Sequence, residues 1–201
     1  MNTAEEILDL AKSTILRESE AVASLASQLD ENFVAVANAL LACEGHVLVA
    51  GSGTSHAVGA RLAHLLSCVG TPAMFIHPGD SQHGLSGAVT SRDVLIALSK
   101  GGETVEVNFL ARLAKEKGAK VIAFTEKPES TLGKTADLVW QVVAPQGVDP
   151  YGMIATGSSL VNSAMGDAMC VVLLTMRGYS KDEFGKTHPG GAVGIQVQKA
   201  S

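Results

Sequence analysis

Short apolar runs alternate with longer segments of mixed polarity along most of the chain. We expect strands at 46–50, 73–76, 94–98, 121–125 and 138–142. These runs are apolar throughout, and only short turns separate them from helix-like segments. That combination is typical of a parallel sheet that helices cover on both faces. The pattern therefore predicts an α/β fold with a five-stranded parallel sheet.

The N-terminal segment predicts a long helix before the first strand. Thr3 and Glu6 have the spacing of a capping box, with Thr3 as the N-cap residue. An apolar stripe follows, interrupted by Glu18, and it comprises Leu8, Ala11, Ile15, Val22, Leu25 and Leu29. The stripe continues at near-heptad spacing, so the helix either packs on its own domain or contacts another subunit.

Further helices complete the predicted domain. One is expected at 31–42, and a long one at 156–177 stops at Gly178, a natural C′ residue. The tail at 184–191 is rich in Gly and Pro, and we expect no helix there. The chain contains no linker or low-complexity stretch. We interpret residues 1–201 as a single domain, divided into N-terminal helices (1–44), an α/β core (45–178) and a C-terminal tail (179–201).

Two strand–turn–helix units share one construction. The first expected strand ends in a small, hydroxyl-rich turn formed by Gly51, Ser52, Gly53, Thr54 and Ser55. Position 56 is His, so the third Gly of a dinucleotide fingerprint is missing, and the only Gly-Lys-Thr triplet lies in the tail. Taken alone, this turn is equally consistent with a plain strand–helix connection.

The second turn strengthens the interpretation as a binding site. Ser99 ends a strand, Lys100, Gly101 and Gly102 follow, and Thr104 is placed to cap the next helix. We expect the glycines to let the backbone approach a ligand. Two such turns place hydroxyls, backbone N–H groups and helix N-termini around one anion, which suits a phosphate.

Candidate proton-transfer groups lie close to these turns. Glu103 is either an acidic residue that favours the first turn of a helix or a carboxylate that moves a proton of a bound substrate. His83 and His188 are further candidates, although a single His is more often structural. No Cys and His pair has metal-site spacing, so we expect no metal and no cofactor.

Charge and composition narrow the classes of partner. The net charge of −5 argues against nucleic-acid binding but leaves room for an anionic small molecule. We expect no apolar stretch of the ~18 to 20 residues that span a bilayer, and no signal peptide. Three cysteines in apolar segments suggest reduced core residues, and hence a cytoplasmic protein.

From about residue 5 to residue 195, the chain resembles the sugar isomerase (SIS) domain family, and within it the arabinose 5-phosphate isomerases. The resemblance rests on the two turns and on four further stretches at 75–84, 150–152, 166–168 and 182–191. It implies a flavodoxin-like three-layer sandwich and a homo-oligomer, a tetramer or a dimer, with shared active sites. It also implies a phosphorylated sugar bound between the turns. In the family, a His matching His188 serves a site at a subunit interface. Full-length relatives often carry CBS domains after the tail, which we do not expect here.

Three positions differ from the pattern of the arabinose 5-phosphate isomerases. Thr54 replaces a Lys of the first turn, Gly147 replaces a Glu, and Gly101 replaces a Ser. By proximity in sequence, Lys100 and Asp149 are candidates for the missing functions.

The leading hypothesis is an aldose–ketose isomerase of a phosphorylated sugar that works through an enediol. Glu103 would be the base, and His188 or His83 would handle ring opening or the hydroxyl protons. The residues expected to hold the phosphate are Ser52, Gly53, Thr54, Ser55, Ser99, Lys100, Gly101 and Thr104. The alternative is a phosphosugar-binding sensor without catalysis, and another reaction of the same domain, such as phosphosugar lysis, is a third possibility.

Overall fold

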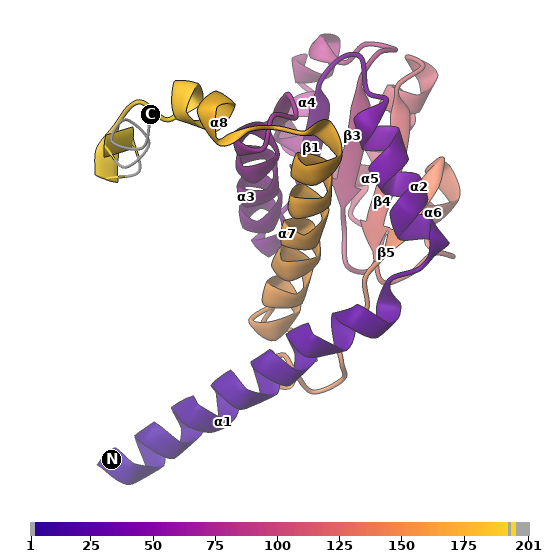
Figure 1. Ribbon diagram of the computed structural model, residues 1–201. Coiled ribbons are helices and arrows are strands. Elements are labelled where there is room, and N and C mark those ends of the chain that lie inside the picture. Colours follow the sequence, from indigo (N-terminus) through magenta and orange to yellow (C-terminus); the bar gives the residue numbers. More distant parts are fainter. Residues whose placement is uncertain (1–2, 193, 196–201) are drawn as a thin grey trace.

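A sheet of five parallel strands forms the centre of the molecule in a computed structural model that describes residues 3–192 and 194–195 (Figure 1). The strand order is β2-β1-β3-β4-β5, which is the flavodoxin-like order. The strands are β1 (Val47–Gly51), β2 (Ala73–Phe75), β3 (Val94–Leu98), β4 (Lys120–Thr125) and β5 (Leu138–Gln141). The predicted strand 94–98 is confirmed without change, and the other four agree to within one residue at each end.

Helices and 3₁₀ turns connect the strands. The α-helices are α1 (Ala4–Ala23), α2 (Glu31–Leu41), α3 (Thr54–Cys68), α4 (Pro78–Ser81), α5 (Val105–Glu116), α6 (Thr131–Thr135), α7 (Gly157–Arg177) and α8 (Lys181–Thr187). The 3₁₀ turns are η1 (Ser24–Gln28), η2 (Leu85–Ala88) and η3 (Pro150–Gly152).

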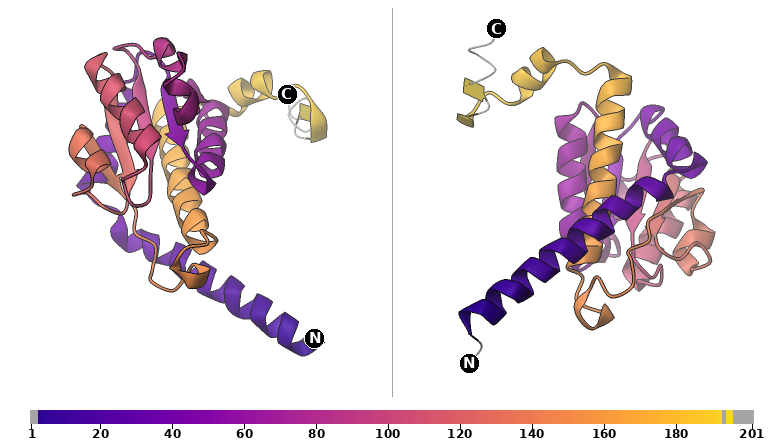
Figure 2. Two further views of the ribbon diagram at one scale, coloured as in Figure 1. Left: turned by 180° about the vertical axis from the view of Figure 1, so that it is seen from behind. Right: turned by 60° about the horizontal axis from the view of Figure 1, so that its bottom comes forward.

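The two faces of the sheet have separate apolar cores. Alternate residues of a strand point to opposite faces, so Val47 and Val49 pack with α2, α3 and α7, whereas Leu48 and Ala50 pack with α5 and α6. Figure 2 shows these helices on the two sides of the sheet. The sandwich confirms the predicted fold class.

Helix α1 projects from the body of the molecule (Figures 1 and 2). The predicted capping box is present: the Thr3 side chain accepts from Glu6 N–H, and the Glu6 carboxylate accepts from Thr3 N–H. Only the C-terminal end of α1 reaches the core, where Ala21 is buried, and the apolar stripe continues into η1 rather than into one long helix. The outer part exposes Ile7, Leu8, Leu10, Ile15 and Leu16.

Helix α7 contradicts the expectation that the chain has no apolar stretch long enough to span a bilayer. It is 21 residues long and apolar enough, by length and composition, to cross a bilayer. In the structure it packs on the sheet and against α1, α2 and α3, with Val161, Met165, Met169 and Leu173 buried. The buried stripe explains the apolar composition of this helix. Its predicted end is confirmed, because Gly178 adopts a left-handed conformation with φ 63°.

The tail also differs from its prediction. Residues 184–187 belong to α8, because Ser180 and Glu183 form a capping box that starts the helix, and Pro189 and the following glycines come only after it ends. The tail leaves the body at the amino edge of the sheet, where a Cβ on Gly70 would touch the Tyr179 ring. Residues 196–201 of the predicted tail lie outside the described residues.

Candidate functional site

The two hydroxyl-rich turns lie side by side at the carboxyl edge of the sheet. Strands β1 and β3 are neighbours, paired from Val47 and Val94 to Gly51 and Leu98, so the turns that follow them meet. Gly53 is the N-cap of α3 with φ 60°, a conformation that favours glycine. A glycine has no capping side chain, which leaves the first N–H groups of α3 open to an anion.

The second turn is held together by its own hydroxyls. Ser99 Oγ lies 2.9 Å from Thr104 Oγ1 and accepts from Gly102 N–H at 3.1 Å. Thr104 is the N-cap residue of α5, but its side chain does not cap the helix, which corrects the expectation. The hydroxyl is instead engaged with Ser99, so it shapes the turn that would receive a phosphate.

The two glycines of this turn have different surroundings. Gly102 has φ 70°, and a Cβ there would overlap the side chain of Ser130. A Cβ on Gly101 would meet nothing within 4 Å. The predicted close approach at Gly102 is therefore an approach to the β4–α6 loop, and Gly101 faces open space.

The Glu103 carboxylate contacts the start of α6. Its oxygens accept from Thr131 N–H at 2.9 Å and from Thr131 Oγ1 at 2.7 Å. These hydrogen bonds hold the pKa of Glu103 below its ordinary value. Glu103 is exposed, so it remains accessible to a ligand, and its role as the base stays a prediction.

Glu106 is a second carboxylate, which sequence reasoning missed. Ser52 Oγ of the first turn donates to Glu106 Oε1 at 2.9 Å, so this acid joins the two turns. Its own backbone N–H, Ser52 and the nearby His77 hold the pKa of Glu106 below its usual range. The available signal was its position in the first turn of the helix that follows the second hydroxylated turn, three residues after Glu103.

Two histidines lie near the first turn, and one of them, His77, is close to Glu106. The rings of His56 and His77 lie 5.5 Å apart, and the His56 ring lies 4.3 Å from that of Phe75. His77 is the N-cap of α4 and accepts from Gly79 N–H through Nδ1. Imidazole and carboxylate groups therefore gather beside the first turn, where proton transfer to a bound ligand is chemically feasible.

Lys100 reaches across the carboxyl edge to the segment before α7. Its Nζ lies 2.9 Å from Asp149 Oδ2 and 3.9 Å from Glu126 Oε1. Asp149 accepts from Ser158 N–H at 2.9 Å and from Ser158 Oγ at 2.6 Å. Burial raises the pKa of Asp149, but the hydrogen bonds from Ser158 and Lys100 outweigh burial and lower it.

Cavities adjoin Lys100 on two sides. A small one of about 30 Å³ lies between the first turn and α7, and its lining includes Thr54, Ser55, Lys100 and Ser158. A larger one of about 560 Å³ is lined by Lys100, Gly147 and Asp149 among others. Several of the phosphate-binding residues predicted from the sequence thus lie at the walls of these cavities.

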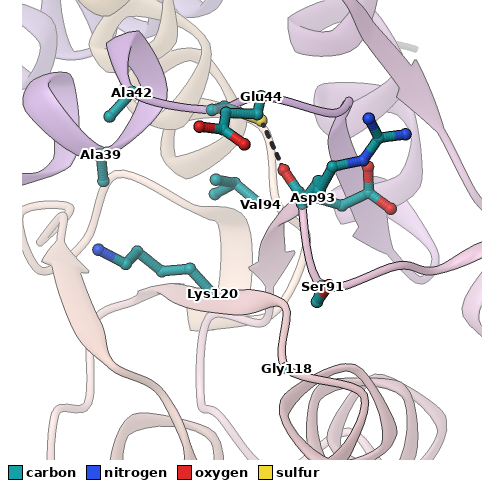
Figure 3. Close-up of a pocket in the computed structure, with 10 residues that line it drawn as sticks. Ala39, Ala42, Glu44, Ser91, Asp93, Val94, Gly118 and Lys120 are labelled. Atoms are coloured by element: carbon teal, nitrogen blue, oxygen red, sulfur yellow. Dashed lines mark hydrogen bonds between the residues drawn. The ribbon is translucent and has the colours of Figure 1, made fainter.

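Another cavity, of about 250 Å³, lies at the opposite edge of the sheet, between the end of α2 and the starts of β3 and β4 (Figure 3). Asp93 is its buried acid, and the carboxylate accepts from the N–H groups of His46 and Thr90. Burial raises the pKa of Asp93, but these hydrogen bonds outweigh burial and lower it. The acid is fully engaged by groups of the protein, so this cavity is a structural feature.

Among the described residues, no hydrogen bond or ring contact joins the side chain of His83 or His188 to either turn, so their roles stay predictions. His83 is exposed just after α4. His188 follows α8, stacks on Phe184 with ring centroids 3.8 Å apart, and lies on the tail that leaves from the amino edge. Across residues 3–192 and 194–195, no group of three or more His, Cys, Asp or Glu side chains is arranged to hold a metal ion.

Comparisons with known proteins agree with this geometry. The family model described as "SIS domain" matches residues 40–161. Among curated proteins, the arabinose 5-phosphate isomerase KdsD of Yersinia pestis is 37% identical over 92% of this chain, and this chain spans 57% of that protein's length. This chain is also 38% identical to the arabinose 5-phosphate isomerase KdsD of Pseudomonas aeruginosa, over 98% of this chain and 61% of that protein's length.

A solved structure has nearly the same fold. The putative sugar-phosphate isomerase of Listeria monocytogenes superposes with a TM-score of 0.91 at 35% identity, covering 94% of this chain and all of that one (100%). The match to the family model, the strand order and the two hydroxylated turns agree: this chain belongs to the SIS domain family.

Proposed function

We propose that the chain is an aldose–ketose isomerase of a phosphorylated sugar, with arabinose 5-phosphate as the first substrate to test. The observation that carries the proposal is the hydrogen bond between Ser52 and Glu106, which places an ionised carboxylate at the junction of the two phosphate turns. The similarity to the KdsD proteins supports it. A protein of Escherichia coli CFT073 that is 30% identical, with a TM-score of 0.89 over 94% of this chain and 100% of that one, was solved in complex with arabinose 5-phosphate.

The phosphate would be held by the turns. Ser52, Thr54 and Ser55 supply hydroxyls at the start of α3, and Ser99 and Thr104 supply them at the second turn. The open N–H groups of α3 add partial positive charge. This anchor fixes the other end of the sugar relative to the carboxylates.

The reaction needs one proton to move between neighbouring carbons. A carboxylate takes the proton from C2 of the open-chain aldose, and the electron pair of that C–H bond forms the C1–C2 double bond of an enediolate. The proton then returns to C1, and the C2 hydroxyl proton moves to the C1 oxygen, which leaves a carbonyl at C2 and a hydroxyl at C1; the ketose forms with no oxidant or reductant consumed. We assign Glu106 this role because of its contact with Ser52, with Glu103 as the other candidate.

Ring opening needs a further acid–base group. His83 and His188 retain this role as proposals, and His188 could reach a site only in a neighbouring subunit, because its tail leaves from the far edge of its own sheet. We therefore propose a homo-oligomer. The exposed apolar residues on the outer half of α1 support subunit contact, because five such side chains on one projecting helix are costly to leave in water.

The test is NMR of the purified protein in D₂O with arabinose 5-phosphate and a panel of other pentose and hexose phosphates. Deuterium at the carbon next to the carbonyl, together with a ketose product, is the expected result. Binding without exchange across the panel would overturn the isomerase assignment and leave a phosphosugar-binding sensor.

A further inference from the structure

Asp149 links Lys100 of the second hydroxylated turn to α7, the 21-residue helix. Its Oδ1 accepts from Ser158 N–H at the start of α7, and its Oδ2 accepts from Ser158 Oγ and from Lys100 Nζ. Thr156, the N-cap residue of α7, makes no capping bond with its side chain. Asp149 therefore caps α7 from outside the helix while it holds the ammonium group of the second turn.

The two side chains of the Lys100–Asp149 ion pair differ in their exposure to solvent. The Asp149 side chain is 3% exposed, whereas that of Lys100 is 40% exposed. Three hydrogen bonds occupy the carboxylate, but Lys100 has three N–H donors, of which Asp149 takes one. The ion pair thus presents its positive end to the outside and buries its negative end.

The partly exposed side chain of Lys100 borders residues that are expected to bind phosphate. Lys100 lines the small cavity together with Thr54 and Ser55 of the first turn. Glu126, 3.9 Å from Nζ, is the other acid beside it, and Lys127 is a second cation at the larger cavity. Among the cations that the structure describes, only Lys100 lines both cavities.

We propose that Asp149 is a positioning residue for phosphate binding, which fixes the ammonium group of Lys100 against the phosphate of the bound sugar. The proposal rests on the proposed function, since it takes a phosphosugar as the ligand of this site. A fixed ammonium group needs no rearrangement when the ligand arrives, so it gives more affinity than a mobile one.

The test is calorimetric binding of arabinose 5-phosphate to the full chain and to Lys100→Met, Asp149→Asn and the double variant. Lys100→Met should raise the dissociation constant ~10- to 100-fold, as expected for loss of a charged hydrogen bond. Asp149→Asn should raise it about tenfold. In the double variant the loss should equal that of Lys100→Met alone, because Asp149 acts through Lys100.

Matched controls come from a second lysine–aspartate pair, Lys115 and Asp137, whose Nζ–Oδ1 distance is 3.1 Å. Asp137 also accepts from a backbone N–H, that of Val121. Lys115→Met and Asp137→Asn should leave the dissociation constant unchanged. If Asp149→Asn does not fold, Ser158→Ala replaces it, because that change removes only the hydroxyl bond to Asp149.

Each outcome decides the proposal. Binding by Lys100→Met or by Asp149→Asn within twofold of the unmodified protein would overturn it, and so would losses from the two single variants that multiply in the double variant. Both outcomes leave the proposed function intact, because the unmodified chain still binds and isomerises the sugar. Absence of binding and of exchange in the unmodified chain would overturn both proposals.

Discussion

Ser52 donates a hydrogen bond of 2.9 Å to Oε1 of Glu106, which lies 54 positions later in the chain. The contact exists because β1 and β3 are adjacent in the sheet although β2 separates them in sequence. Topology thus places a carboxylate from one strand–helix unit at the turn of the other. A substrate phosphate bound at either turn would have this acid as a neighbour.

Glutamine in place of either glutamate separates the two candidate bases. We expect Glu106→Gln to lower kcat ~10²- to 10⁴-fold, the usual contribution of a general base. Steady-state kinetics with arabinose 5-phosphate measure this, and calorimetry should show that the variant still binds the sugar.

Glu103→Gln is the matched control, since it removes a carboxylate three positions before Glu106. If this variant loses the activity and Glu106→Gln retains it, the base is Glu103, as the sequence alone suggests.

The hydrogen bond from Ser52 predicts a change in the titration of Glu106. The backbone N–H of Glu106 and the Ser52 hydroxyl both favour the ionised form, so the native pKa lies below the ordinary glutamate value of ~4.3. Ser52→Ala should raise the pKa, and the carboxylate should become protonated at a higher pH than in the unmodified protein. The ¹³C shift of the Glu106 carboxyl, assigned by its loss in Glu106→Gln, follows this directly. An unchanged midpoint would show that the bond is absent in solution.

The lowered pKa of Glu106 also makes the stability of the fold depend on pH. The native pKa of Glu106 is depressed, so this group stabilises the fold above the unfolded pKa and loses that contribution as the pH falls through the native one. Ser52→Ala should therefore lose stability at neutral pH and approach the unmodified protein in strong acid.

Alanine should destabilise the fold at one glycine of the second turn and not at the other. Gly102→Ala would force a Cβ against Ser130 at a φ of 70°, and we expect a loss of about 1–3 kcal/mol in the free energy of unfolding. Gly101→Ala meets nothing within 4 Å and should be nearly neutral. Urea denaturation of both variants measures the difference, and equal stability would contradict the close approach to Ser130.

Lysine at the exposed apolar positions of α1 tests the proposed assembly. Leu8→Lys with Ile15→Lys should lower the mass measured by light scattering after size-exclusion chromatography, because charges would be buried at the subunit contact. Lys12→Glu, on a polar position of the same helix, should not change the mass. A monomeric unmodified protein would contradict the proposal.

The sequence predicted the strands well because they are apolar at most positions, most clearly in β1 and β3, which are buried at every position. It also located both hydroxylated turns. It missed Glu106 because an acidic residue in the first turn of a helix is common and has no local mark of function. It missed α8 because the Gly- and Pro-rich composition of 184–191 suggested no helix, whereas the capping box of Ser180 and Glu183 starts one that ends at Thr187.

The contact between Lys100 and Asp149 is another feature that the sequence alone does not predict. The two residues are 49 positions apart, and only the folded sheet brings them within 2.9 Å. Proximity in sequence could suggest each as a candidate, but not that one holds the other. The two roles of Asp149, toward Lys100 and toward α7, depend on tertiary geometry.

Helix α7 has a mechanical consequence. Its 21 residues form a rod of about 31 Å that begins at the site with Ser158 and ends at Gly178, where the tail departs. A tilt of about 5° at the seated end would displace the far end by about 3 Å. A small change of tilt at the N-terminus of α7, which Asp149 caps, would therefore move the segment that carries His188.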